Sequence, residues 1–66
     1  MNQITVFQTT YQMASAPKWV RAELKRILEK AGGNTTIATD LDTAPSATHA
    51  MRHKAKDLCT RFGLPA

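Results

Sequence analysis

The sequence contains little of what small proteins use to cross-link themselves. Its 66 residues include one cysteine, Cys59, so neither an internal disulfide nor a cysteine-based zinc site can form. A lone thiol is typical of proteins in a reducing compartment, which predicts a cytoplasmic location. A chain this short lies near the lower size limit of independent folding, and we expect pairing with a second copy to supply further stability.

Long apolar runs and catalytic signatures are also missing. No apolar run approaches the roughly 20 residues that span a bilayer, and the start MNQITVFQTT lacks the basic region of a signal peptide, so no membrane partner is expected. Phosphate-cradling glycine loops, paired catalytic carboxylates and Ser/His/Asp signatures do not occur. The sequence therefore predicts a protein that is not an enzyme and that uses no cofactor.

Acidic residues are scarce relative to basic ones. Nine lysines and arginines stand against five aspartates and glutamates, which gives a net charge of +4. The basic residues fall in segments 16–30 and 46–66, whereas segment 31–45 carries two aspartates and no base. A small basic chain favours an acidic partner, and we expect double-stranded DNA. The alternative is a solvated surface with a surplus of lysine.

One segment has the composition of a β-strand. Ile4, Val6 and Phe7 are β-branched or aromatic, and the segment Gln3–Thr10 is predicted to be extended. The chain offers no second candidate strand, so the backbone groups of this one would lack partners. We therefore expect it to pair with the same strand of a second copy, with Ile4, Val6 and Phe7 at the dimer interface.

A first helix is predicted after a connector that ends at residue 14. Ser15 is a candidate N-cap, Pro17 suits the first turn, and Gly32-Gly33 ends the helix. Its apolar residues are spaced as one helical face: Trp19, Val20, Leu24, Ile27, Leu28 and Ala31. We expect Trp19 to anchor the core rather than to lie exposed.

Two further helices are predicted, a short one capped by Asn34 or Thr35 and one that runs from about Pro45 to Arg61. Cys59 is expected to be a small buried residue. The predicted core consists of Leu24, Ile27, Leu28, Ile37, Leu41, Met51 and Leu58. The sequence thus predicts one mostly α domain over 1–66, with a strand and connector over 1–14 and a three-helix bundle over 15–63.

The second and third predicted helices have features of a helix-turn-helix. Ala38 is small enough for close helix approach, and the third helix has a basic outer face. The corner Ala31-Gly32-Gly33-Asn34, with Ala38 beyond it, resembles the C-terminal helix-turn-helix of the Fis family and related bacterial enhancer-binding activators. The sequence departs from the family at Asp42-Thr43 and at His49. The resemblance implies a helix-turn-helix that binds DNA.

These features predict a small transcriptional regulator, such as a repressor of bacterial, phage or plasmid origin, with residues 45–61 in the major groove. Residues near the start of this helix would reach the bases, and Lys56 and Arg61 would hold phosphates. The predicted DNA-binding set is Ser46, Thr48, His49, Arg52, His53, Lys56 and Arg61. His49, His53 and Asp57 share helical spacing, but a third strong ligand is not apparent, so no metal site is expected.

Two alternatives stay open at this point. A ribbon-helix-helix dimer also begins with one strand, which pairs across the dimer and enters the major groove. A small inhibitor or adaptor would instead dock on a larger protein through the N-terminal strand and Trp19. A DNA-binding protein should present a wet, basic third helix, whereas an adaptor should expose Ile4, Val6, Phe7 or Trp19.

Overall fold

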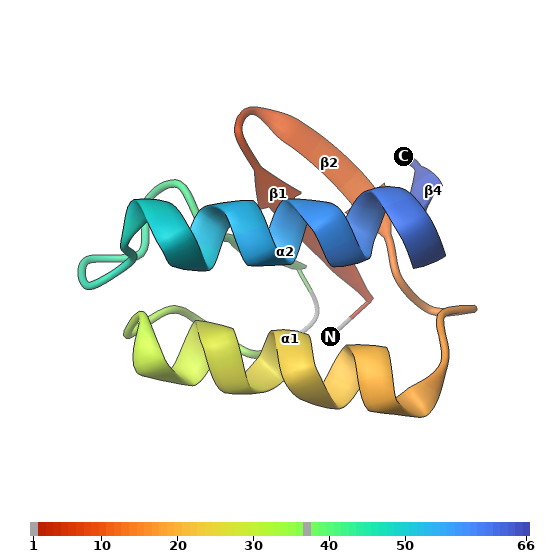
Figure 1. Cartoon of the computed structure of the whole chain (residues 1–66), viewed down its shortest axis with the longest axis horizontal. Coiled ribbons are helices and arrows are strands. Elements are labelled where there is room, and N and C mark those ends of the chain that lie inside the picture. Colours follow the sequence, from red (N-terminus) through yellow and green to blue (C-terminus); the bar gives the residue numbers. More distant parts are fainter. Residues whose placement is uncertain (1, 37) are drawn as a thin grey trace.

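The protein is built from two layers, a four-stranded sheet and a pair of helices. The computed structural model describes residues 2–36 and 38–66. Its elements in chain order are β1 (Gln3–Val6), β2 (Thr9–Gln12), α1 (Lys18–Lys30), β3 (Ala38–Asp40), α2 (His49–Phe62) and β4 (Leu64–Pro65) (Figure 1). The strand order in the sheet is β3-β1-β2-β4. The prediction of a three-helix bundle with one N-terminal strand and a helix-turn-helix is therefore wrong.

Residues 3–12 form a hairpin rather than a single strand. β1 and β2 pair antiparallel, and Phe7 and Gln8 form the turn between them. β1 also pairs with β3, so its backbone groups find partners within the chain. Ile4 and Val6, expected at a dimer interface, are fully buried in the chain's own core. Pairing of the strand across a homodimer is therefore wrong, and self-association stays a prediction without this support.

The segment predicted as a second helix contains β3 instead. β3 pairs parallel with β1, and the Leu41 N–H continues the ladder by donating to the Thr5 carbonyl at 2.8 Å. A helix of about two turns gains little by itself, and β-branched threonines favour strands. The edge of β1 that is not paired with β2 offers this segment backbone hydrogen bonds, so the segment forms a strand instead of a helix. Leu41 is buried as predicted, but Ile37, also assigned to the core, lies outside the described residues.

Helix α1 confirms the predicted buried face. Val20, Leu24, Ile27, Leu28 and Ala31 are buried. The helix begins one residue after Pro17, which occupies the N-cap position predicted for Ser15. It ends at the two glycines: the Gly33 N–H donates to the Leu28 carbonyl at 2.8 Å and the Gly32 N–H to the Glu29 carbonyl at 3.1 Å. This pattern requires a left-handed residue, and Gly32 has φ of 73°.

Trp19 was expected in the core, and this prediction is wrong. The residue is 58% exposed. It directly precedes Val20, which occupies the buried face of α1, and neighbouring helical positions point about 100° apart. The tryptophan therefore projects from the outer side of α1, where the structure packs it against only part of α2.

Helix α2 begins at His49, later than the predicted start near Pro45. The hydroxyl of Thr48 accepts a hydrogen bond from the Met51 N–H at 3.2 Å and so caps the helix there. Pro45 and Ser46 belong to a turn, in which the Ser46 N–H donates to the Ala31 carbonyl at 2.8 Å. Leu58 and Cys59 are buried as predicted, whereas Met51 is half-buried.

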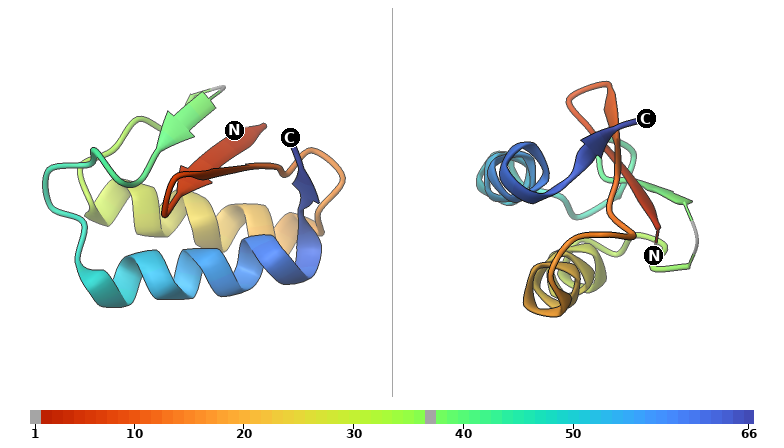
Figure 2. Two further views of the ribbon diagram at one scale, coloured as in Figure 1. Left: turned by 90° about the horizontal axis from the view of Figure 1, so that it is seen from above. Right: turned by 90° about the vertical axis from the view of Figure 1, so that its right-hand side faces the viewer.

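Both helices lie on the same side of the sheet (Figure 2). Alternate strand residues, including Ile4, Val6 and Tyr11, point toward the helices and are buried. The opposite face is polar and uncharged near its centre, where the hydroxyls of Thr5 and Thr10 lie 2.7 Å apart. An antiparallel pair with one wet face is the expected result of this alternation.

The hairpin turn is held by a distant side chain. Phe7 and Gln8 have φ values of 49° and 64°, which cost non-glycine residues about 1–2 kcal/mol each. The Asp42 carboxylate accepts hydrogen bonds from both turn N–H groups, at 2.8 Å to Phe7 and 2.8 Å to Gln8. Hydrogen bonds to charged groups stabilise by about 1.5–3 kcal/mol each, enough to offset this strain.

We predict that Asp42→Ala destabilises the protein by about 3 kcal/mol, because two hydrogen bonds to a charged group are lost. Adding Gln8→Gly to Asp42→Ala should recover about 1 kcal/mol, since glycine adopts a left-handed conformation without steric cost. Urea denaturation of the single and double variants measures both effects. Gln8→Ala is the control, since it keeps a Cβ. Equal stability of the alanine and glycine variants at residue 8 would contradict the account of strain.

Candidate functional site

The charges of the protein are distributed unevenly between its two layers. All nine lysines and arginines lie on the helical layer, defined as α1 and α2, which carries three acidic residues. The other two acidic residues, Asp40 and Asp42, lie in β3 and in the turn that follows it. The helical layer is therefore strongly basic, and the remainder of the chain is acidic. Such a bipolar distribution orients the protein toward an anionic surface.

A groove runs between the outer sides of the two helices. The helices are antiparallel, so the second half of α1 faces the first half of α2 (Figure 1). Ile27 is buried and Met51 half-buried beneath the groove, whereas its charged side chains reach solvent. The residues that line this interhelical groove are Glu23, Arg26, Ile27, Lys30, Ala50, Met51 and Lys54.

Glu23 organises the charges of the interhelical groove. Its carboxylate accepts a hydrogen bond from Lys54 Nζ at 2.9 Å and lies 3.7 Å from Arg26 Nη1. The hydrogen bond from Lys54, together with the positive charges of Lys54, Arg26 and Lys30, lowers the pKa of Glu23 below its ordinary value of 4.5. Among the described residues, Lys30 makes no ion pair. With three basic side chains and one acidic side chain, the groove carries a net positive charge.

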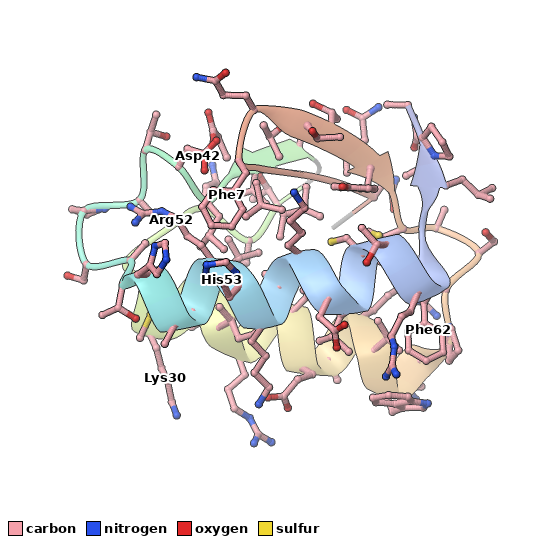
Figure 3. All side chains as sticks on the ribbon, turned by 45° about the horizontal axis from the view of Figure 1, so that its top comes forward. Phe7, Lys30, Asp42, Arg52, His53 and Phe62 are labelled. Atoms are coloured by element: carbon pink, nitrogen blue, oxygen red, sulfur yellow. The ribbon has the colours of Figure 1, made fainter. Side chains whose placement is uncertain are left out.

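An aromatic pair lies at the other end of the same helical side. The Trp19 and Phe62 rings are T-shaped, with centroids 5.3 Å apart, and Trp19 remains 58% exposed. Trp19 shares a stripe of α1 with Glu23, Arg26 and Lys30, because these residues recur at spacings of three and four. Lys30 and Phe62 mark opposite ends of the helical layer (Figure 3).

The opposite side of α2 packs against the hairpin turn. The Nε2 atoms of His49 and His53 lie 2.8 Å apart. The ring centroids of Phe7 and His53 are 5.1 Å apart. Lys56 Nζ lies 5.4 Å from the centre of the Phe7 ring. Arg52 lies on this side as well (Figure 3). The structure thus gathers four of the predicted DNA-binding residues on the side of α2 that packs against Phe7, where His49 and His53 remain exposed.

The other predicted DNA-binding residues are dispersed. Thr48 caps α2, Ser46 belongs to the preceding turn, and Arg61 lies near the far end of α2, 3.8 Å from Asp57. The predicted DNA-binding set omitted the residues of the opposite side, chiefly Trp19, Arg26, Lys30 and Phe62. Trp19 was expected either in the core or, in the adaptor alternative, as a docking residue. The spacing along α1 could have revealed three of them, but Trp19 had been assigned to the core.

The remaining candidates for chemistry are weak. Cys59 is fully buried, as expected for a small core residue, and its burial raises the pKa of the thiol to about 12. Such a thiol is a poor nucleophile. Within residues 2–36 and 38–66, no three potential metal-ligating side chains come together. In the same part of the chain, neither helix is long and apolar enough to cross a lipid bilayer.

Comparisons with known proteins find no protein-family model, no curated protein and no solved structure that matches this chain. The resemblance to the Fis family therefore rests on sequence residues alone. Of these residues, Ala31, Gly32, Gly33 and Asn34 end α1 or follow it, and Ala38 lies in β3 instead of a helix. Family membership stays a prediction, whereas the helix-turn-helix that it implied is not formed.

We predict that the Glu23–Lys54 contact makes stability depend on pH. Because folding lowers the pKa of Glu23, the stabilising effect is present above pH 4.5 and disappears as the pH falls through the folded-state value. Glu23→Gln should therefore melt below the wild type at pH 7, and this difference should vanish near pH 3. Glu29→Gln is the matched control, since it removes the same charge from α1 outside the groove. A Glu23→Gln deficit that is independent of pH would contradict the prediction.

Proposed function

We propose that the protein binds nucleic acid through the outer surface of the helical layer, with the sugar–phosphate backbone as the main contact. One observation carries this proposal: all nine lysines and arginines lie on the two helices that cover one face of the sheet. Neutralising phosphates releases condensed counterions, which supplies most of the affinity of sequence-independent binding. A cytoplasmic location, predicted from the lone cysteine, would give the protein access to nucleic acid.

The interhelical groove is the part of this surface best arranged to follow a backbone. Arg26, Lys30 and Lys54 extend from two different helices toward the same groove. Glu23 holds Arg26 and Lys54 beside each other, which limits the side-chain entropy lost when a phosphate binds. The cost is one negative charge within the groove. Recognition of duplex DNA and regulation of transcription stay predictions, now without a helix-turn-helix to support them.

Of the two earlier alternatives, the adaptor keeps a specific observation in its favour. Trp19 is 58% exposed, as the adaptor alternative expected, and its ring forms an exposed aromatic pair with Phe62. The ribbon-helix-helix alternative loses its basis. Its N-terminal strand would have to pair across a dimer, but β1 lies between β2 and β3 of its own chain.

We predict that the double variant Arg26→Gln/Lys30→Gln binds oligonucleotides more weakly than the wild type. Loss of two phosphate contacts should reduce the slope of log affinity against log salt by roughly 1.4 for single strands and 1.8 for duplexes. Fluorescence anisotropy with labelled DNA and RNA of mixed sequence, at several salt concentrations, measures this slope.

The control is Lys18→Gln/Lys25→Gln, which removes the same charge from α1. These two lysines line a separate hollow together with Arg21 and Ala22. The control variant should keep most of the affinity if the groove is the binding site. Equal losses in both double variants would mean that the groove has no special role. Absence of salt-dependent binding to every oligonucleotide by the wild type would refute the proposed function and favour the adaptor.

A further inference from the structure

The exposed aromatic pair lies in line with the positive groove. Trp19, Glu23, Arg26 and Lys30 form one stripe along α1, and Phe62 and Lys54 face that stripe from α2. A ligand that follows the interhelical groove from Lys30 and continues along the stripe past Glu23 therefore reaches Trp19. The distance along α1 between these two residues is about 16 Å at 1.5 Å per residue.

The indole of Trp19 is both accessible and oriented. Its residue is 58% exposed, the highest value among the large apolar residues of the described chain. The T-shaped contact with Phe62, at 5.3 Å between centroids and 78° between planes, restricts rotation of the ring. Many proteins hold an unpaired nucleobase on an exposed, restricted aromatic ring that lies beside basic side chains. Every nucleobase offers a flat face for such stacking.

We propose that the occupant of this surface is single-stranded nucleic acid, with phosphates on Arg26, Lys30 and Lys54 and one base stacked on Trp19. This inference rests on the proposed function and names its substrate class. A single strand suits the site because its bases can leave the stack and turn toward a side chain. In a duplex the base faces are covered by their neighbours, so Trp19 would find no partner there. With stacked nucleotides about 3.4 Å apart, the stripe accommodates roughly five of them.

Charge complementarity favours this occupant over an apolar peptide. The stripe that begins with Trp19 also contains Arg26 and Lys30, and Lys54 faces it from α2. An apolar peptide that docked on Trp19 and Phe62 would bury the aromatic pair but would make no contact with the adjoining lysine and arginine side chains. A nucleic-acid strand engages both parts of the surface at once.

The single tryptophan of the chain provides a direct measurement. Oligo(dT) and oligo(U) of about 15 nucleotides should quench its fluorescence on binding, whereas a duplex of equal length should not. Trp19→Ala should weaken binding of the single strands by about 5- to 150-fold, as expected for the loss of one stacked base. Its salt dependence should stay at the wild-type value, because no charge is removed. Trp19→Phe should recover most of the affinity.

Leu64→Ala is the matched control, since it removes another exposed apolar side chain, on β4, and should leave binding unchanged. Circular dichroism of Trp19→Ala and Trp19→Phe separates a loss of stacking from a loss of folding. If single strands and duplexes bind equally well, with no quenching and no effect of Trp19→Ala, stacking is refuted while backbone binding stands. If no oligonucleotide binds, the proposed function itself fails.

Discussion

The carboxylate of Asp42 connects the tip of the hairpin to a segment 34 to 35 residues later in the sequence. It accepts hydrogen bonds from Phe7 and Gln8 at the tip of the hairpin and lies just beyond β3, which pairs with β1. The same turn directs the Phe7 ring toward the histidines of α2. One side chain therefore fixes the hairpin turn to the segment that follows its edge strand β3, and the contact with α2 is made by the Phe7 ring. Without the Asp42 carboxylate, two residues would keep a left-handed conformation that their side chains disfavour.

The location of the basic surface follows from the one-sided packing of the sheet. Ile4, Val6 and Tyr11 direct the apolar face of the hairpin toward the helices, so each helix must bury one side and leave its outer side in water. Uncharged Gln and Thr side chains cover the exposed sheet face around the hairpin, whereas every lysine and arginine lies on a helix. Packing alone explains why charge is on the outer side of the helices, but not why its sign is so uniform.

The sequence allowed a correct prediction where local signals were strong. The buried face of α1 and its end at Gly32 followed from periodicity and from the conformational freedom of glycine. The hairpin was missed because its turn contains Phe7 and Gln8 rather than the usual asparagine and glycine, and it depends on a residue distant in the sequence. β3 was mistaken for a helix because a three-residue strand carries little periodicity and gains its stability from β1.

The candidate site was also predicted incompletely, because it depends on contacts between segments that are distant in the sequence. The predicted recognition face belonged to α2 alone, whereas the groove takes side chains from both helices, and no single-helix pattern reveals which stripes will face each other. The positive charge of segments 16–30 and 46–66 could nevertheless be predicted, since composition does not depend on the fold. Spacing along α1 would have grouped Trp19 with Arg26 and Lys30 once its exposure was known.

The order of the strands implies an order of assembly. β1 and β2, joined by a tight turn, occupy the centre of the sheet, and β3 and β4 arrive at its two edges from much later in the chain. A hairpin closes within about 1–10 μs, whereas each edge strand must first close a long loop, with a correspondingly larger entropic cost. We therefore expect the sheet to form from its centre outward, and the two-residue β4 to open more readily than the central hairpin in the folded protein.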